Sequence, residues 1–593
     1  MSIVVGLDLG TTNCAVAWAD STADELQIND FPVPQLTYPG TVEPRSTLPS
    51  FLYLPGAHEL PEHSIELPWD GTATRVVGWL AREQSAKIPH RVVSSAKSWL
   101  SNEFVDRHSA ILPWQAPAEI IKLSPVQVAA TYLEHIKSAW DYQNPQVPLS
   151  EQDLVLTVPA SFDAVARELT VEAARQAGLT NLTLLEEPQA ALYSWIAGSG
   201  ESWRKQVAPG DRILVCDVGG GTTDFSLINV TDNDGDLSLE RVAVGDHILL
   251  GGDNMDLTLA VAVRQRLKKE RDLKLDSWQM QVLTHGCRVG KEQLLQEYAD
   301  EDWPITIPGR GSSLIASSIS TELKRADVEQ LLLEGFFPVC SPHEELPRPK
   351  RGGLTELGLP FEADPGITRH LARFLQVHAE EGDFFRPTAV LFNGGVFKAP
   401  RIRNRVEQIL NSWLAEAGAQ PVRVLQGIDQ DLAVSRGAAR YGVARQGKGL
   451  RIRGGTNRSY YIGIESSAPA IPGLDPEVNA LCVAPFGMEE GTSAPVQSRQ
   501  FGLVVGEPVE FRFLGSTVRK KDAVGTYLED WEDELQELAT IGTTLDGGDA
   551  PLGTVIPVTL ESQVTEIGTL ELWCHEVQGA GRWKLEFEVR NVE

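Results

Sequence analysis

Two short turns in the sequence have the composition of a phosphate-binding site. One reads Gly-Thr-Thr-Asn at 10–13 and follows an apolar run at 3–9, and the other reads Gly-Gly-Gly-Thr-Thr at 219–223 and follows an apolar run at 213–218. Glycine lets such a turn close tightly, and successive backbone N–H groups together with threonine hydroxyls form a concave anion site. One copy is weak evidence, because many hairpins contain Gly-Thr-Thr without a ligand. Two copies predict two halves of the molecule that clamp one polyphosphate and its metal.

Carboxylates lie beside these turns or at a similar strand end. Asp8 and Asp217 close the two apolar runs, where each could hold a cation or orient a water molecule, and Asp224 follows the second turn. Glu187 precedes Pro188, a residue that suits the first position of a helix. Taken alone, Glu187 is interpreted as a charge that interacts favourably with the dipole of that helix.

The elements that must position these residues are predicted from apolar patterns. Runs rich in Ile, Val and Leu indicate buried strands at 3–9, 153–159, 213–218 and 388–393. A helix capped by Asp163 is expected to end near Ala177. A third glycine turn, at 393–395, precedes a helix expected over 399–417, and it would let a nucleotide approach the backbone closely.

Length and composition limit the class of protein. The 593 residues predict two to four domains, and the formal net charge of −29 argues against a broad nucleic-acid or anionic-membrane surface. The six cysteines have no metal-ligand or CxxC spacing and are interpreted as reduced, mostly buried thiols. We find no signal-peptide pattern and no apolar run of transmembrane length. These features predict a soluble, cytoplasmic protein of bacterial type.

Other segments have less specific patterns. A basic cluster is interpreted as a solvated face: Lys87, His90, Arg91 and Lys97. Residues 342–365, rich in Pro, Gly and charge, are interpreted as an insertion or loop, and short alternating strands from about 456 to 593 predict an antiparallel β-domain. Within that domain, the spacing of four apolar residues predicts a short acidic amphipathic helix: Leu528, Trp531, Leu535 and Leu538.

The motifs, taken together and in this order, resemble those of the DnaK-type heat-shock-70 chaperones, within the actin/sugar-kinase/heat-shock-70 ATPase superfamily. The stretches that carry the resemblance over 1–445 are Gly6 to Asn13, Leu156 to Phe162, Glu187-Pro188, Asp217 to Asp224, Leu250 to Asp253, and Asn393 to Gly395. The C-terminal match is looser. The resemblance implies an α/β fold with a two-lobed, actin-like nucleotide-binding domain at 1–445 that has a duplicated mixed-sheet core. It also implies a linker at 446–455 and an antiparallel β-sandwich, substrate-binding-like domain at 456–593.

The same resemblance implies that ATP or ADP binds with Mg²⁺ in a cleft between two lobes. Thr11, Thr12 and Asn13 would bind the β- and γ-phosphates, and Thr222 would contact the γ-phosphate. Further nucleotide contacts are implied for Gly10, Gly219, Gly220, Gly221, Thr223, Gly251, Gly252, Asp253, Lys291, Gly394, Gly395 and Asp431.

The resemblance also assigns catalytic roles. Asp8 and Asp217 would hold Mg²⁺ through water, and Glu187 and Asp224 would place the attacking water. The catalytic lysine of the family matches Arg82. Because arginine is bulkier and hydrogen-bonds as a planar fork, we expect hydrolysis to be slow or absent while binding persists.

Other departures from the family concern the base and the connection between domains. Arg288, Glu292 and Leu295 stand where the family commonly has Glu, Arg and Ser, and Val396 replaces a small polar residue, so base and ribose contacts are expected to differ. The acidic, leucine-rich linker is replaced by a basic segment rich in glycine. The sequence ends at Glu593 without a helical lid, and a lidless binder is expected to release peptide quickly.

The leading hypothesis is a heat-shock-70-like chaperone that binds and slowly hydrolyses ATP and holds unfolded polypeptide by strand addition to its β-domain. Phe501 and Phe511 are candidates for the peptide cleft, although a β-domain core uses the same residues. A J-domain co-chaperone and a nucleotide exchange factor are expected partners, and nucleic acid and membranes are not. One alternative is a nucleotide-binding regulator or exchange-factor-like relative with little ATPase activity. Another is a small-molecule kinase of the same superfamily, although no sugar-binding constellation is readable.

Overall fold

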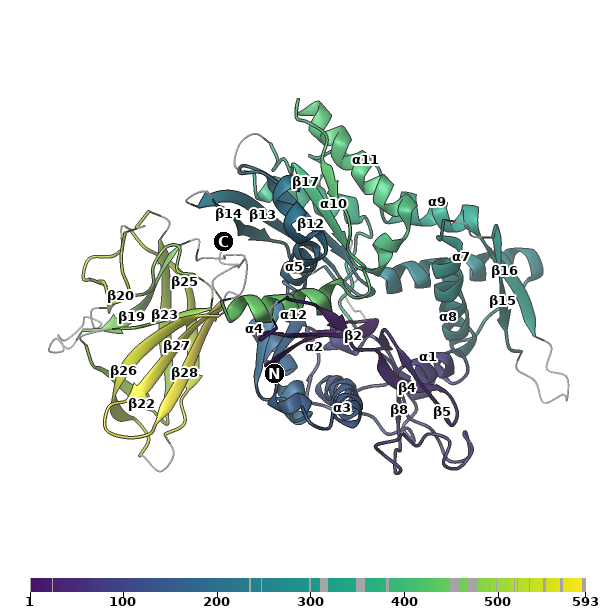
Figure 1. Cartoon of the computed structure of the whole chain (residues 1–593), viewed down its shortest axis with the longest axis horizontal. Helices are drawn as coiled ribbons and strands as arrows, with labels where there is room; N and C mark the ends of the chain where they lie inside the picture. Colours follow the sequence, from purple (N-terminus) through teal and green to yellow (C-terminus); the bar gives the residue numbers. More distant parts are fainter. Residues whose placement is uncertain are drawn as a thin grey trace. The chain divides into compact units, whose positions relative to one another are not determined.

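The structure is a computed structural model, shown in Figure 1. It describes residues 2–23, 25–233, 236–246, 248–297, 300–309, 318–347, 358–379, 383–447, 456, 458–466, 478–489, 491–496, 499–516, 518–519, 521–532, 534–547, 551–565 and 569–588. The chain divides into two compact units, Met1–Arg451 and Ile452–Glu593. Most of the predicted linker at 446–455 lies outside the described residues.

The first unit contains two mixed sheets. The first sheet is built from β1 (Ile3–Leu9), β2 (Asn13–Asp20), β3 (Asn29–Asp30), β6 (Leu48–Pro49), β10 (Asp153–Val158) and β11 (Leu182–Glu186). Its order is β11-β10-β1-β2-β3, and β6 also pairs with β2. Strand β1 is parallel to β10, which is parallel to β11, and antiparallel to β2, which is antiparallel to β3.

The second sheet repeats this connectivity. It is built from β12 (Arg212–Val218), β13 (Thr223–Asn233), β14 (Asp236–Val244), β17 (Ala389–Asn393) and β18 (Arg423–Leu425). Its order is β14-β13-β12-β17-β18, with antiparallel pairs on the β13 side of β12 and parallel pairs on the β17 side. The predicted mixed α/β sheets are therefore confirmed, and each Gly–Thr turn joins the first two strands of a sheet.

Helices α5 (Glu187–Ser199) and α12 (Ala433–Arg445) connect the two sheets through a close crossing. Helix α12 contacts β1, β2 and β10 of the first sheet, and α5 contacts both β10 and β11 of the first sheet and β12, β13 and β17 of the second. At the crossing, a Cβ on Gly437 would lie 1.7 Å from the backbone oxygen of Ala190. The two backbones are thus in direct contact, and a glycine is required there.

The other helices of the first unit complete two lobes around the sheets. They are α1 (Trp79–Ser85), η1 (Pro89–Arg91), α2 (Ala96–Leu100), α3 (Pro125–Gln143), η2 (Leu149–Glu151), α4 (Ala164–Gln176), η3 (Gly200–Ser202), α6 (Trp203–Gln206), α7 (Gly252–Arg271), α8 (Ser277–Leu294), α9 (Arg325–Gly335), α10 (Ile367–Val377), η4 (Gly395–Lys398) and α11 (Pro400–Glu416). We call the part of residues 2–186 lobe 1 and the part of residues 212–425 lobe 2. None of the described helices is both long and apolar enough to cross a membrane.

Three small sheets extend the lobes. They are formed by β4 (Val33–Tyr38) with β5 (Thr41–Arg45); by β7 (Leu52–Tyr53), β8 (Val76–Val77) and β9 (Val92–Val93); and by β15 (Asp302–Ile307) with β16 (Ile319–Lys324). Of the predicted loop at 342–365, the described residues form no helix or strand, and 348–357 lies outside them.

The start of α4 shows why these elements form where the sequence predicts. The Asp163 side chain accepts a hydrogen bond from the backbone N–H of Ala166 at 2.6 Å, which satisfies one of the free donors of the first turn. The helix ends just before Gly178, whose φ of +79° suits a left-handed C-terminal residue.

The second unit consists of two five-stranded antiparallel sheets. One has the order β24-β20-β19-β23-β25 and is built from β19 (Ser459–Glu465), β20 (Val478–Ala484), β23 (Pro508–Ser516), β24 (Tyr527–Leu528) and β25 (Gln536–Thr544). The other is built from β21 (Thr492–Pro495), β22 (Phe501–Val505), β26 (Thr554–Val564), β27 (Thr569–Glu576) and β28 (Arg582–Glu588). Phe513 stacks on Tyr460 at 5.3 Å and on Phe587 at 4.5 Å, so the two sheets share one core.

The predicted helix around 528–538 is wrong. Leu528 ends β24, and Leu538 lies in β25. Between these strands, Trp531 and Leu535 are buried in a small cluster with Tyr461, and the indole of Trp531 donates to the backbone oxygen of Val478 at 2.6 Å. The helical spacing therefore arises from a connection that buries two apolar side chains.

Candidate phosphate-binding cleft

A cavity of about 380 Å³ opens between lobe 1 and lobe 2, within the size range of small-molecule sites. It brings together most of the predicted residues: Asp8, Gly10, Thr11, Thr12, Asn13, Glu187, Asp217, Gly219, Gly220, Thr222, Gly252, Asp253, Lys291, Gly394, Gly395 and Asp431. Five predicted residues do not line it: Arg82, Gly221, Thr223, Asp224 and Gly251. Of these, only Arg82 lies away from the two Gly–Thr turns and the carboxylates around them.

The two Gly–Thr turns meet at this cavity. A Cβ on Gly220 would lie 1.8 Å from the hydroxyl oxygen of Thr12, so the approach of the turns requires a glycine. The start of α7 supports the second turn, because the backbone N–H of Gly252 donates to Gly219 at 3.0 Å and that of Asp253 donates to Gly220 at 2.7 Å. Hydroxyl and amide donors from both lobes therefore surround one small space, as a polyphosphate site needs.

Four carboxylates are gathered at the inner end of the cavity. Asp217 accepts a hydrogen bond from Asn393 at 2.7 Å, and Asp224 accepts one from Ser161 at 2.5 Å. Burial and the negative charge of Glu187 raise the pKa of Asp8 to about 7 and hold the pKa of Asp217 well above its usual range. Burial also raises the pKa of Asp224. Burial therefore makes these three carboxyls hold protons more readily than exposed aspartates do, and a bound cation would favour their charged forms.

Lys97 is the cation that contacts this group, and the sequence interpretation missed it. Its side chain is 4% exposed, and its ammonium forms an ion pair with Glu187. Burial alone would lower the pKa of Lys97, but the carboxylates of Glu187 and Asp8 raise it overall. The interpretation of Lys97 as part of a solvated face is therefore wrong. A usable signal was its setting between Val92, Val93, Ala96, Trp99 and Leu100, all of which are buried.

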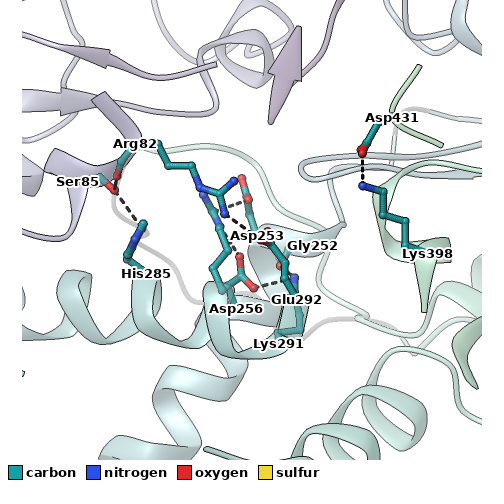
Figure 2. A network of polar contacts seen from close by, with 11 residues as sticks. Arg82, Ser85, Gly252, Asp253, Asp256, His285, Lys291, Glu292, Lys398 and Asp431 are labelled. Carbon is teal, nitrogen blue, oxygen red and sulfur yellow. Dashed lines mark hydrogen bonds and ion pairs between the residues drawn. The ribbon is translucent and has the colours of Figure 1, made fainter. Parts of the chain in front are cut away.

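Arg82 lies against a different carboxylate, Glu292, and its role as the catalytic cation stays a prediction. It lies on α1, where Nη2 is 2.9 Å from Glu292 on α8 and the guanidinium is 5.8 Å from the Trp79 ring. Figure 2 shows Arg82 beside Glu292. The expectation of slow hydrolysis, which rested on an arginine in place of lysine, stays a prediction as well.

A buried ionic network forms the lobe 2 wall of the cavity. Asp256, which is 1% exposed, accepts from Arg288 Nε and is paired with Lys291, both at 2.7 Å. Although burial raises the pKa of Asp256, Lys291 and Arg288 lower it overall. Arg288 also donates to Asp253 at 2.7 Å, so its guanidinium is bonded to two aspartates. Figure 2 shows the pair of Asp256 and Lys291 from this network. Arg288, one of the expected departures from the family, therefore links two aspartates of the cavity wall. The sequence motifs did not reveal Asp256.

A second buried ionic group lies next to Glu187. Glu186 is fully buried and forms an ion pair with Arg241 of β14, while Arg167 of α4 lies 3.8 Å away. Since β14 belongs to the second sheet and β11 to the first, this group joins the two lobes directly before the predicted catalytic glutamate.

The outer end of the cavity is lined by a different kind of residue. The ammonium of Lys398 pairs with Asp431, and both side chains are more than a third exposed. Leu295 and Val396, two of the predicted departures, are half-buried there. Gly394 has a φ of +86°, and a Cβ on it would lie 2.3 Å from the backbone oxygen of Val218. Only glycine therefore fits the turn that separates this end from Asp217.

The residue types fit a polyphosphate with a divalent cation. Carboxylate oxygens are hard ligands, and Mg²⁺ is commonly held by one or two carboxylates together with water and phosphate. In the part of the chain that the structure describes, no group of three or more His, Cys, Asp or Glu side chains is placed to hold a metal ion by itself. Asp8 and Asp217 would therefore hold Mg²⁺ through water and with the help of the phosphates.

The two peptide candidates lie in the second unit, in different sheets. Phe501 is the first residue of β22 and Phe511 lies in β23, and both are half-buried against the shared core. Their use as core residues was the competing interpretation.

Comparison with known proteins gives one family. Residues 69–346 match the family described as Hsp70 protein. The chain is 27% identical over 358 residues to Chaperone protein DnaK of Buchnera aphidicola subsp. Schizaphis graminum, covering 57% of this chain and 50% of the relative. It is 32% identical over 274 residues to Chaperone protein HscA of Photorhabdus laumondii subsp. laumondii, covering 44% and 38%. It is 30% identical over 311 residues to Chaperone protein HscA of Xenorhabdus nematophila, covering 51% and 44%. The chain thus spans half or less of the length of these relatives.

Proposed function

The chain belongs to the Hsp70 family, and on that premise we propose that it is a chaperone that binds and hydrolyses ATP in the cleft. The observation that carries the proposal is the buried pair of Lys97 and Glu187, placed among Asp8, Asp217 and Asp224 between the two Gly–Thr turns. Phosphoryl transfer to water needs positioning and charge neutralisation, and these residues offer both.

Each group has a proposed role. The hydroxyls and backbone N–H groups of 10–13 and 219–223 bind the phosphates of ATP. Asp8 and Asp217 would hold Mg²⁺ through water, and the bound Mg²⁺ would neutralise phosphate charge. Glu187 and Asp224 accept hydrogen bonds from the attacking water, and Lys97 holds positive charge beside Glu187, where negative charge develops.

A calorimetric titration with Mg-ATP tests the nucleotide half of the proposal. The wild-type chain is expected to bind, and Asp8→Asn and Asp217→Asn are each expected to weaken binding by about ten- to a hundredfold, as loss of outer-sphere metal partners does. Asp272→Asn, at an aspartate whose side chain is 87% exposed, serves as the matched control and should bind like wild type. Absence of Mg-ATP binding by the wild type, or wild-type affinity in both variants, would contradict the proposal.

The proposed chaperone half concerns the second unit. We infer that its two sheets are a β-sandwich that holds extended apolar polypeptide by strand addition and side-chain pockets, with Phe501 and Phe511 as candidate contacts. A J-domain co-chaperone and a nucleotide exchange factor are the expected partners. Binding of a fluorescent, apolar, extended peptide to the full chain, measured by anisotropy with and without Mg-ATP, tests this half. Peptide binding that neither saturates nor responds to the apolar content of the peptide would count against it.

A further inference from the structure

Helix α2 carries Lys97, and both lobes contact it. All five residues of this short helix, Ala96–Leu100, are buried. Lys97 forms its ion pair with Glu187 at the start of α5. Ser95, two positions before Lys97, and Ser98, directly after it, lie against residues of lobe 2. The position of the lysine therefore depends on parts of the molecule that lie on opposite sides of the cleft.

Ser95 has an unusual backbone conformation. Its φ of 54° and ψ of 31° are left-handed, a region that residues other than Gly, Asn and Asp rarely adopt. Such a conformation persists only where surrounding contacts determine it. One of these contacts is a hydrogen bond that the hydroxyl of Ser95 donates to Asp253 Oδ2 at 2.5 Å, and it spans from lobe 1 to lobe 2.

The acceptor of this hydrogen bond is fixed on lobe 2. The other carboxylate oxygen of Asp253 accepts from Arg288 at 2.7 Å, and Arg288 is held in turn by the buried Asp256. The backbone N–H of Asp253 donates to Gly220 in the second turn. The carboxylate of Asp253 cannot rotate toward Ser95 independently, so it follows the movement of lobe 2 as a whole.

Ser98 provides a second contact on the same helix. A Cβ on Gly221 would lie 2.7 Å from the hydroxyl oxygen of Ser98 and 2.8 Å from a methyl carbon of Thr11. The side chain of Ser98 therefore lies where the two Gly–Thr turns meet. Together, Ser95 and Ser98 bracket Lys97 with contacts to lobe 2.

We propose that Ser95 is a positioning residue, whose hydrogen bond to Asp253 holds α2 so that Lys97 lies against Glu187 when the two lobes are closed. This inference rests on the proposed ATPase function and adds a link between closure of the cleft and placement of the lysine. When lobe 2 moves away, Asp253 leaves Ser95, the left-handed backbone loses the contact that balances it, and α2 relaxes with Lys97.

Single-turnover hydrolysis of ATP by the full chain tests the proposal, with ATP affinity measured in parallel. Ser95→Gly keeps the left-handed backbone without strain but removes the hydroxyl, so it should fold normally and hydrolyse about 5- to 10-fold more slowly, with affinity within about twofold of wild type. Ser95→Asn tolerates the same backbone and retains a donor for Asp253, so it should recover most of the rate.

Ser85→Ala is the matched control. It removes another serine hydroxyl that crosses the cleft, since Ser85 Oγ lies 3.1 Å from His285 Nδ1, but it does not touch α2. We expect a rate within about twofold of wild type, because the loss of this single, partly buried hydrogen bond between the lobes leaves the contacts of Lys97 in place. If Ser85→Ala slows hydrolysis as much as Ser95→Gly, the effect comes from lobe contact in general and the proposal is overturned.

A double-mutant cycle with Lys97→Met shows whether Ser95 acts through the lysine. In the Lys97→Met background, Ser95→Gly should lower the residual rate no further. An additive effect would overturn the proposal, and so would a wild-type rate in Ser95→Gly when Lys97→Met is slow. The proposed function fails in a different way: wild-type protein then binds no Mg-ATP, or Lys97→Met hydrolyses ATP as fast as wild type.

Discussion

The inner and outer ends of the cleft are built in different ways. At the inner end, two equivalent turns and the carboxylates of Asp8 and Asp217 come from corresponding positions of two repeated sheets, Glu187 and Asp224 lie beside them, and the charged groups are buried. At the outer end, the polar side chains come from unrelated elements and are partly exposed, as in the pair of Lys398 and Asp431. Buried charges in a low-dielectric setting interact strongly, whereas exposed pairs are screened. The inner end is therefore expected to decide chemistry, and the outer end to adjust affinity.

The largest expected effect is at the inner end, from Lys97→Met. Removing this charge should lower the single-turnover hydrolysis rate by about 10²–10³-fold, as loss of a preorganised electrostatic group does, while Mg-ATP still binds. Arg82→Met is the control on the neighbouring cation and should stay within about threefold of wild type. If Arg82→Met is the slower variant, Arg82 and not Lys97 supplies the catalytic charge, and the assignment of Lys97 is wrong.

The next effect concerns the wall between the two ends. Asp256→Asn leaves Arg288 and Lys291 without their buried counter-charge, and removal of one partner of such a group costs about 3–5 kcal/mol. Thermal and urea unfolding of the whole chain measure this loss. Asp327→Asn, at a carboxylate that is 52% exposed and 3.5 Å from Arg266, should change stability by less than about 1 kcal/mol.

The pH dependence of Asp256 gives a second test of the same wall. Because the folded-state pKa of Asp256 lies below its usual value, the stabilisation is fully present at neutral pH and is lost as the pH falls through the folded-state pKa. The difference in unfolding free energy between wild type and Asp256→Asn should therefore shrink on acidification below the ordinary aspartate range. A difference that grows toward low pH would contradict the ionic role.

A smaller effect is expected from Gly394→Ala, at the turn between the two ends. The substitution puts a methyl group against Val218 in a left-handed backbone and should cost about 2 kcal/mol of stability. Mg-ATP affinity should fall as well, because Asn393 and Asp217 are hydrogen-bonded beside this turn. Gly395→Ala is the matched control, since a Cβ there meets nothing within 4 Å and its φ is not positive. Equal stability losses in both variants would remove the conformational explanation.

The smallest effect is expected at the outer end. Lys398→Met breaks the exposed pair with Asp431 and should change stability by less than about 1 kcal/mol. Its effect on ADP affinity, measured by calorimetry, should stay within about fivefold. A loss of affinity as large as that of Asp217→Asn would show that the outer end holds the nucleotide as strongly as the inner end.

Local features of the inner end could be predicted from sequence, and contacts between distant residues could not. The Gly–Thr turns, Asp8 and Asp217 were found because they lie at the end of an apolar strand, a pattern contained in a few consecutive residues. Glu187 was assigned to the site only through the family resemblance. Lys97 was missed because its burial depends on two turns more than eighty residues away on either side. Asp256 and Arg288 are 32 positions apart and meet only because α7 packs on α8.

The same reasoning explains the errors and the open predictions. The spacing of Leu528, Trp531 and Leu535 fits a helix, but tertiary burial of two of these side chains produced the pattern in a connection between strands. Arg82 was chosen by its position after a Val-Gly pair, and the sequence alone does not show that α1 packs with this arginine against Glu292. The domain limits, the role of each site residue, and the peptide contacts at Phe501 and Phe511 stay predictions.

The crossing of α5 and α12 has a mechanical consequence. Because the backbones of Gly437 and Ala190 already touch, the crossing cannot be compressed, and the lobes can pivot about it but cannot slide closer. The crossing would then act as the hinge about which the two lobes rotate. Gly437→Ala adds one methyl group at this crossing and should hold the two lobes apart. Small-angle scattering with Mg-ATP should then give a larger radius of gyration than for the wild type.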